Sequence, residues 1–365
     1  MSKRIRTLDS FFSPPPTKRT KVQNPIDNEA QNDAHTANNA CVVQARSEHA
    51  TYPFSVPCLP PSLRELLNFV PAAEGQLIRD QPDLDLVYYT PFIPKDAQKH
   101  LFEFLRRELF FYRVKYNIKR GPVETAINTP RFTTVFGVDD TARFKDNEVC
   151  HTGSGTPMPK DTYKCSPRPL PQCLDVLREL TENATGCKFN FALVNYYADG
   201  NDSISYHSDD ERFLGSDSAP VLAFTLGGTR DFLLKHKPTP QKHESESKPT
   251  KLPLTSGDMV LMRGKTQSCW LHSIPKRKGP QGERGRINIT FRRAMVRGGT
   301  ENYYRCSVLS LSLLSPRLGR SGTWMPSNDD LRYNVGDGGP YRWSIDQGEM
   351  IPWTAPSSST SSVPP

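Results

Sequence analysis

The sequence has no apolar run that could cross a membrane. A membrane-spanning helix needs about 20 consecutive, mostly apolar residues, and none of the 365 residues lies in such a run. The N-terminal stretch MSKRIRTLDSFFSPPPTKRTKVQ also lacks the apolar segment of a signal peptide. We therefore expect a protein that does not associate with a membrane.

Paired cysteines are also missing. The eight cysteines show no C-x-x-C pair and no regular spacing. This pattern is typical of free thiols in a reducing compartment, and it argues against a zinc site. The net charge of +8 and the sequence pI of about 9.0 suit a polyanionic partner, although many basic proteins bind no nucleic acid.

Changes in composition divide the chain into four parts. Residues 1–57 are polar and aperiodic, which predicts a disordered tail. Residues 58–82 form a linker or an ordered entry segment, residues 83–298 a folded domain, and residues 299–365 a C-terminal extension. Within the extension, residues 306–332 have no clear period, and their removal would join NYYR smoothly to YNVGDGGPYRW. Two interpretations stay open, an insertion such as a retained intron or a surface loop.

Helices precede strands in the folded domain. PKDAQKHLFEFLRREL has the helical apolar period, and PQCLDVLRELTEN predicts a second helix that ends near Gly186. Short strand patterns follow, and we expect PVLAFTLGG and RDFLLKH to pair as a hairpin around Gly227 and Gly228. This order predicts a mainly β, α+β fold, an antiparallel sandwich or barrel with helices on one side.

One histidine and three carboxylates crowd the stretch YHSDDERF. His207 and Asp209 stand two residues apart, so in an extended segment both side chains point the same way. His272 follows a predicted strand in WLHSIP. Two histidines and one carboxylate make the facial triad that holds non-haem Fe(II). Each part alone is explained as well by a charged loop or a structural histidine.

The strand RINITFR has one polar and one apolar face. Ile287, Ile289 and Phe291 alternate with a polar set, namely Arg286, Asn288, Thr290 and Arg292. Burial of two unpaired guanidinium groups is costly, so the polar face must meet solvent or hold an anion. A small dicarboxylate fits the arginine fork. Asn195 and Tyr197, at the end of FNFALVNYY, are candidates for further hydrogen bonds to that anion.

The order of these motifs resembles that of the AlkB-type Fe(II)/2-oxoglutarate dioxygenases, most closely their nuclear DNA-repair members. The matching stretches are NYYADGNDSISYHSDDE, LGGTRDFLLKHK, MVLMRGKTQSCWLHSIP, RINITFR and TTVFG. The resemblance covers residues 83–298 and implies a double-stranded β-helix, or jelly-roll, core. It implies Fe(II) and O2 at His207, Asp209 and His272, and it implies that 2-oxoglutarate is bound by Asn195, Tyr197, Arg286, Thr290 and Arg292. Arg286 is expected to hold the distal carboxylate, with Asn288 behind these ligands.

The resemblance also implies a reaction and a substrate. The expected function is oxidative demethylation of N1-methyladenine and N3-methylcytosine in DNA, with release of formaldehyde, succinate and CO2. The expected partner is methylated duplex DNA. Asp210 matches the family position that contacts the substrate, where a carboxylate favours a cationic methylated base. Phe136, beside Gly137 at an expected hairpin tip, matches a wedge residue that fills the gap left by a flipped base, and its alternative is a core position. Tyr163 matches a base-stacking position in the substrate lid.

The N-terminal tail contains two short motifs. IRTLDSFF resembles a sliding-clamp-binding motif with Leu8, Phe11 and Phe12 as plug residues, although Ile5 replaces the usual glutamine. TKRTK is a candidate nuclear localisation signal, so we expect a nuclear protein, and a monomer. Two other functions stay open, an RNA demethylase or protein hydroxylase, and a non-catalytic nucleic-acid-binding adaptor. The intact triad and both arginines argue against the adaptor.

Overall fold

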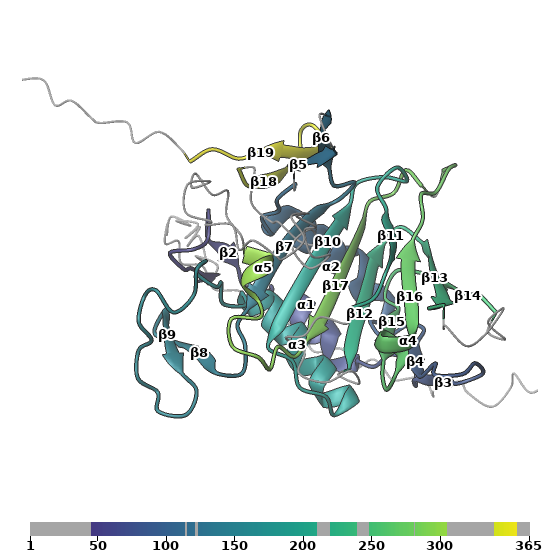
Figure 1. The fold of residues 1–365 in the computed structure, drawn as a ribbon, viewed down its shortest axis with the longest axis horizontal. Helices are drawn as coiled ribbons and strands as arrows, with labels where there is room; N and C mark the ends of the chain where they lie inside the picture. Colours follow the sequence, from purple (N-terminus) through teal and green to yellow (C-terminus); the bar gives the residue numbers. More distant parts are fainter. Residues whose placement is uncertain are drawn as a thin grey trace, which may run out of the picture. The chain divides into compact units, whose positions relative to one another are not determined.

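Two antiparallel sheets organise the chain (Figure 1). The structure is a computed structural model, which describes residues 45–113, 115–120, 123–209, 220–238, 248–280, 282–304 and 339–355. The larger sheet has seven strands in the order β3 (Gln76–Ile78), β4 (Leu86–Tyr89), β15 (Met259–Met262), β12 (Val221–Gly227), β17 (Arg286–Arg292), β10 (Phe191–Tyr197) and β7 (Phe132–Gly137). The smaller sheet has four strands in the order β11 (Ile204–His207), β16 (Trp270–Ile274), β13 (Arg230–His236) and β14 (Thr250–Leu254).

Two long helices pack on one side of the larger sheet. The two long helices are α2 (Lys95–Glu108) and α3 (Gln172–Thr185), and the shorter ones are α1 (Pro61–Leu66), the 3₁₀ helix η2 (Leu67–Phe69), α4 (Thr266–Cys269) and α5 (Glu301–Tyr304). The α2 side chains Ala97, Leu101, Phe104 and Leu105 are buried at the predicted helical spacing. Gly186 ends α3 with a φ of 69°, which glycine adopts without a Cβ penalty. No helix in the described part of the chain is long and apolar enough to cross a membrane.

Four two-stranded ribbons complete the secondary structure of the described residues. They are β1 (Arg46–Ser47) with β2 (Val56–Pro57), β5 (Lys115–Arg120) with β6 (Val123–Asn128), β8 (Ala142–Lys145) with β9 (Glu148–His151), and β18 (Tyr341–Ser344) with β19 (Glu349–Pro352). The folded part of the chain includes residues before residue 58, where the sequence predicted a disordered tail. Val56, for example, is fully buried in the main core. The C-terminal ribbon also packs on the domain, where Trp343 lies edge-on against Tyr196.

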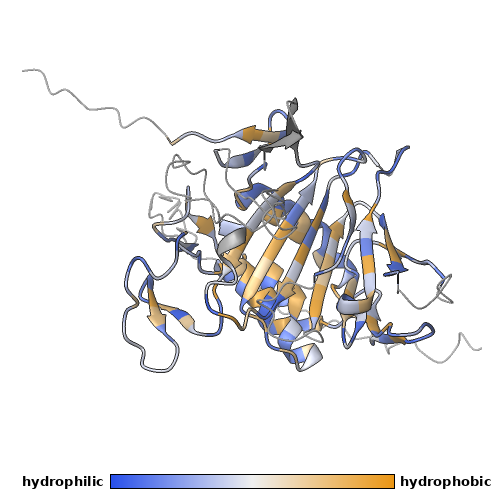
Figure 2. Cartoon of the chain, in the orientation of Figure 1, coloured by the Kyte–Doolittle hydropathy of each residue, from blue (hydrophilic) through white to orange (hydrophobic). Residues whose placement is uncertain are grey.

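The apolar residues form two layers, one on each face of the larger sheet. Ile287, Ile289 and Phe291 of β17 pack in the core shared with α2 and α3, and each such buried side chain stabilises the fold by about 1.5–3 kcal/mol. Figure 2 shows the resulting apolar stripes along the large strands. A second apolar cluster, which includes Phe232 and Trp270, fills the space between the two sheets. The predicted jelly-roll core with flanking helices is therefore confirmed.

The predicted hairpin of the strands 220–228 and 230–236 is wrong. β12 lies in the larger sheet and β13 in the smaller one, so the glycines between them turn the chain from one sheet to the other. Gly227 has a φ of 89°, and a Cβ there would stand 2.4 Å from the carbonyl oxygen of Gly285. This corner brings the two sheets face to face, and the polar side of β17 points into the space between them.

Candidate active site

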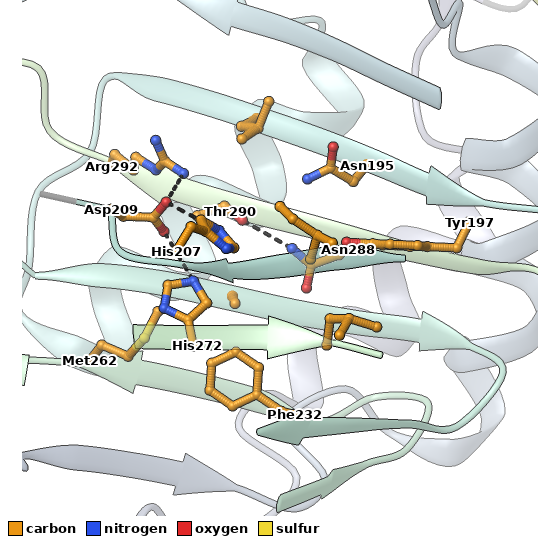
Figure 3. Close-up of a pocket in the computed structure, with 14 residues that line it drawn as sticks. Asn195, Tyr197, His207, Asp209, Phe232, Met262, His272, Asn288, Thr290 and Arg292 are labelled. Atoms are coloured by element: carbon orange, nitrogen blue, oxygen red, sulfur yellow. Dashed lines mark hydrogen bonds and ion pairs between the residues drawn. The ribbon is translucent and has the colours of Figure 1, made fainter. Parts of the chain in front are cut away.

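Three predicted ligands meet at one end of this space. His207 and His272 are direct cross-strand partners of β11 and β16, and their ring centroids lie 4.3 Å apart. His207 Nε2 lies 3.8 Å from Asp209 Oδ1, and His272 Nε2 lies 3.8 Å from Asp209 Oδ2. Figure 3 shows the three side chains converging on one point. The ligand atoms lie within 4.8 Å of one another, which suits a single metal ion.

Asp209 is held from both its backbone and its side chain. Its backbone N–H donates to Oε1 of Gln267 over 2.9 Å. Arg292 donates from Nη2 to Oδ1 of the carboxylate over 2.6 Å (Figure 3). The buried carboxylate therefore has a fixed direction, and its second oxygen faces His272.

The protonation states favour a metal. Burial lowers the pKa of His207, and burial together with the neighbouring His207 lowers the pKa of His272 to about 3. Both imidazoles are thus neutral near pH 7, which is the form that binds a metal. Although burial favours the neutral acid, the charge of Arg292 lowers the pKa of Asp209. His207 Nδ1 lies 2.9 Å from the carbonyl oxygen of Ser205, so that its Nδ1–H donates there and Nε2 is left for the metal.

Arg286 and Tyr197 lie at the other end of the polar face. They are cross-strand partners of β17 and β10, and the guanidinium carbon of Arg286 lies 5.2 Å from the centre of the Tyr197 ring. Arg286 is fully buried and donates from Nη2 to Thr225 Oγ1 and Asn288 Oδ1 over 2.9 and 3.1 Å. Among the described residues, no hydrogen bond of good geometry reaches its Nε or Nη1, although the Tyr197 side chain favours the charged form. Burial lowers the pKa of Arg286 to about 10.

The two unpaired nitrogens of Arg286 show whether the site suits a dicarboxylate. A buried charge that lacks a partner lowers the stability of the fold by several kcal/mol. No carboxylate of the described chain pairs with Arg286, so an anion supplied from outside would meet its Nε and Nη1. The residues present therefore fit 2-oxoglutarate, with the metal triad at one end and Arg286 at the other.

Asn195 and Thr290 lie between the two ends. Both line the same pocket as the triad. Thr133 donates from Oγ1 to Asn195 Oδ1 over 2.8 Å, and Arg131 donates from Nε to the same oxygen over 3.3 Å. The Asn195 amide nitrogen is thereby directed away from these donors, and it is available as a donor. Asn288 donates from Nδ2 to Thr290 Oγ1 over 3.0 Å, which orients the hydroxyl.

Phe136 is a core residue and no wedge. It lies in the interior of β7, it is fully buried, and its ring packs against Phe110 and Tyr52. The predicted hairpin tip is wrong because β7 pairs with β10 along its whole length. Gly137 ends the strand and accepts a hydrogen bond from Tyr304 Oη over 2.7 Å through its carbonyl oxygen, so it is a packing position too.

Tyr163 also differs from the prediction. It packs in a small apolar cluster with Val138 and Ala142, and it is not among the residues that line the pocket. Its hydroxyl donates to Asp139 Oδ2 over 3.0 Å. Burial and the charge of Asp139 raise the pKa of Tyr163 to about 12. A ring enclosed in this way presents no free face to a base.

Some predictions concern residues outside the described part of the chain. These are Asp210, the segment 306–332 and the clamp-motif residues Leu8, Phe11 and Phe12. The site also contains residues that sequence reasoning missed. Tyr303 accepts a hydrogen bond from Arg292 Nη1 over 2.6 Å, and Gln267 holds Asp209. The apolar pattern of the sequence could not indicate either contact, because Gln267 and Tyr303 lie in helices of only four residues, α4 and α5.

The comparisons with known proteins agree with this geometry. The 2OG-Fe(II) oxygenase superfamily matches residues 85–292, more than half of the chain. The chain therefore belongs to the 2OG-Fe(II) oxygenase superfamily. Within it the chain is of the AlkB type, since the curated relatives that it matches include ALKBH2 proteins and alkB homolog 3 proteins.

Three relatives illustrate the likeness. The chain is 36% identical over 155 residues to DNA oxidative demethylase ALKBH2 of Bos taurus, which covers 42% of this chain and 52% of that protein. It is 38% identical over 141 residues to alpha-ketoglutarate-dependent dioxygenase alkB homolog 3 of Rattus norvegicus, which covers 37% and 46%. It is 34% identical over 140 residues to DNA oxidative demethylase ALKBH2 of Arabidopsis thaliana, which covers 34% and 43%. The chain thus spans about half the length of the curated relatives it matches.

Proposed function

We propose that this protein is an Fe(II)/2-oxoglutarate-dependent dioxygenase that removes N-methyl groups from alkylated DNA bases. The substrates are N1-methyladenine and N3-methylcytosine. One molecule each of 2-oxoglutarate and O2 is consumed per methyl group, with release of formaldehyde, succinate, CO2 and the restored base. The observation that carries the proposal is a buried triad of two histidines and one carboxylate that faces the polar side of β17, where the buried Arg286 has two nitrogens without a well-formed hydrogen bond among the described residues.

His207, Asp209 and His272 would hold Fe(II). Both imidazoles are already neutral near pH 7, so they need not release a proton when the metal binds, and Asp209 is ionised. When bound, Fe(II) with 2-oxoglutarate and O2 supplies the oxidising chemistry. The protein aligns the ligands through Gln267 and Arg292, whose contacts with Asp209 fix its direction.

The remaining polar residues would hold 2-oxoglutarate. Arg286, with Tyr197 alongside, binds the carboxylate far from the metal, because Arg292 is already engaged by Asp209 at the metal end. Asn195 and Thr290 donate to the molecule between these ends. Apolar side chains complete the wall and exclude water from the reacting groups, namely Leu193, Ile204, Phe232, Met262 and Ile274.

The relatives support DNA as the substrate class. The bovine and Arabidopsis proteins are DNA oxidative demethylases by name, and the positive net charge of +8 suits a polyanion. Asp210 follows the metal ligand Asp209 directly, where its carboxylate would favour a cationic methylated base. The burial of Phe136 removes the wedge as support for a duplex substrate, so single-stranded and duplex DNA must be compared.

The test is reconstitution of the full chain without oxygen. The protein is loaded with Fe(II) and 2-oxoglutarate, then exposed to air with an oligonucleotide that carries one N1-methyladenine, and mass spectrometry follows the methyl group. We expect methyl loss with equimolar formaldehyde and succinate in the wild type and none in His207→Ala. Single-stranded DNA, duplex DNA and RNA of one sequence are assayed in parallel.

The negative outcomes are distinct. Methyl loss from RNA alone would replace the DNA proposal by an RNA demethylase. Consumption of 2-oxoglutarate without methyl loss from any nucleic acid would point to another substrate, such as a protein. No consumption at all, in protein that binds Fe(II), would support a non-catalytic adaptor.

We further propose that the protein acts in the nucleus and contacts a sliding clamp through Leu8, Phe11 and Phe12. Both proposals rest on the sequence motifs of the N-terminal tail. Binding of a peptide of residues 1–20 to a purified sliding clamp is measured, with Phe11→Ala and Phe12→Ala in one peptide as the control. Equal affinity of the two peptides would end the clamp proposal.

A further inference from the structure

A second group of metal-ligating side chains lies outside the site described above. Asp83, His236 and Cys269 offer a carboxylate oxygen, an imidazole nitrogen and a thiol sulfur, all within 4.8 Å of one another. They come from the segment between β3 and β4, the end of β13 and the end of α4. We propose that these three side chains bind a divalent cation of the Zn²⁺ class. The irregular cysteine spacing concealed this group, because only one of its ligands is a cysteine.

The three ligand atoms lie almost close enough together to bind one ion. His236 Nε2 lies 3.7 Å from Asp83 Oδ2, close to the 3.8 Å between each imidazole Nε2 and the carboxylate in the first triad. Nitrogen and oxygen ligands of one tetrahedral zinc stand about 3.3 Å apart, given bond lengths of about 2.0–2.1 Å. Small side-chain rotations therefore bring the two atoms onto one ion.

His236 is already oriented for this role. Its Nδ1 lies 2.7 Å from the carbonyl oxygen of Lys237, so that Nδ1–H donates there and the Nε2 lone pair faces Asp83. Metal-binding histidines nearly always have the second ring nitrogen held in this way. The ring of Trp270 lies edge-on at 5.4 Å and limits rotation of the imidazole.

The donor set selects the class of metal. A thiolate, an imidazole and a carboxylate suit Zn²⁺, whereas Mg²⁺ and Ca²⁺ prefer oxygen ligands alone. Three protein ligands leave a fourth position for water. Lys265 Nζ lies 3.7 Å from Asp83, but at Oδ1, the oxygen that does not face His236. The Lys265 side chain is 73% exposed and the Asp83 side chain 37% exposed, so the lysine can turn to solvent and an ion can enter.

The proposed site would brace the candidate active site without sharing a ligand with it. Cys269 ends α4, and Gln267 in the same helix accepts the backbone N–H of Asp209. β16 (Trp270–Ile274) follows α4 directly and contains His272. A bound ion would fix α4 to β13 and thereby the segment that positions Asp209. The inference does not depend on the proposed function, because it concerns other residues.

Cobalt distinguishes the two sites by their ligands. Metal-free full-length protein is titrated with Co²⁺ without oxygen, and the near-ultraviolet thiolate-to-cobalt charge-transfer band is followed. His207, Asp209 and His272 contain no sulfur and produce no such band. We expect a band in the wild type that is displaced by Zn²⁺. In His207→Ala, where the triad lacks a ligand, the band should be retained and should saturate at one equivalent. Cys269→Ser should lose the band and bind one Co²⁺ fewer per chain.

Two further variants keep the test decisive. Cys187→Ser, at another partly buried free cysteine, is the matched control and should retain the band. His236→Asn should weaken Co²⁺ binding at this site by at least about tenfold, in line with the loss of a metal ligand or its support, and it serves if Cys269→Ser does not fold. No band in the wild type, or a band that persists in Cys269→Ser and His236→Asn, would overturn the proposal.

Discussion

Arg292 and Asp209 form a fully buried ion pair, with Nη2 and Oδ1 separated by 2.6 Å. The arginine comes from the polar face of β17 and the carboxylate from the segment after β11. The pair therefore joins the two sheets at the metal end of the pocket. It also keeps the metal-binding carboxylate ionised where burial alone would favour its neutral form.

Removal of the arginine should weaken metal binding. In Arg292→Met the Asp209 carboxylate loses its cationic partner, so its pKa rises and protons compete with the metal. We expect affinity for Fe(II) or Co²⁺ at the triad to fall by about 10- to 100-fold, the usual cost of losing a partner behind a ligand. The matched control is Arg293→Met, which breaks the exposed ion pair with Asp140. Equal losses in both variants would contradict this role for Arg292.

Tyr303 should hold the Arg292 guanidinium in the position in which it contacts Asp209. Its hydroxyl accepts from Arg292 Nη1 over 2.6 Å, and hydrogen bonds to charged groups contribute about 1.5–3 kcal/mol. We expect Tyr303→Phe to lower kcat/KM for the oxidation by roughly tenfold, since that energy corresponds to tenfold or more. Tyr304→Phe is the control, because its hydroxyl instead donates to the carbonyl oxygen of Gly137. It should lower the melting temperature and leave kcat/KM nearly unchanged.

Arg286 should determine affinity for 2-oxoglutarate. Arg286→Lys retains the charge and loses the planar fork, whereas Arg286→Met loses both. We expect the KM for 2-oxoglutarate to rise by about tenfold or more in the first variant and further in the second. Metal affinity, measured with Co²⁺, should remain within about twofold, because Arg286 does not contact the triad. A KM equal to that of the exposed control Arg284→Met would contradict the assignment.

Stability of the metal-free protein should fall as the pH drops below about 6.5. Burial lowers the pKa of His272 to about 3, and it also lowers the pKa of His207. Between the unfolded value near 6.5 and the folded value, the unfolded chain binds more protons, so the free energy of unfolding decreases with falling pH. Urea unfolding at pH 7 and pH 5 measures the change, well above the range in which Asp209 titrates. His272→Asn should show a smaller difference between the two pH values than the wild type.

Phe136 should matter for stability and not for DNA binding. Phe136→Ala leaves a cavity in the core and should cost about 3–5 kcal/mol of unfolding free energy. At a temperature where the variant is folded, its affinity for duplex DNA should match that of the wild type. Tyr206→Ala, at a ring that is 38% exposed, is the control with little effect on stability. A large loss of duplex affinity in folded Phe136→Ala would restore the wedge hypothesis.

The sequence predicted the parts of the site that follow strand periodicity. His207 and Asp209, two residues apart, meet in the triad, and β17 alternates between an apolar and a polar face as expected. The position of Phe136 could not be predicted, because alternation does not tell a strand next to a hairpin tip from a strand whose side chains are buried in the core. The sheet change at Gly227 was missed for a related reason, since glycine permits a hairpin and a corner equally.

Contacts that depend on register between distant segments could not be predicted at all. Tyr303 lies beyond residue 298, where the resemblance to the family ends, yet it contacts Arg292. Asp83, His236 and Cys269 come from three segments that are far apart in the sequence, and the fold brings them together. No pattern in the chain marks either meeting point.

The lone guanidinium of Arg286 has a consequence for the life of the protein in a cell. Because no carboxylate in the described part of the chain pairs with this buried charge, a dicarboxylate that binds there favours the folded state by mass action. Both 2-oxoglutarate and the product succinate carry the required carboxylate. We therefore expect the protein to resist proteolysis better when these metabolites are plentiful, so that its abundance would follow the carbon supply of the cell as well as its expression.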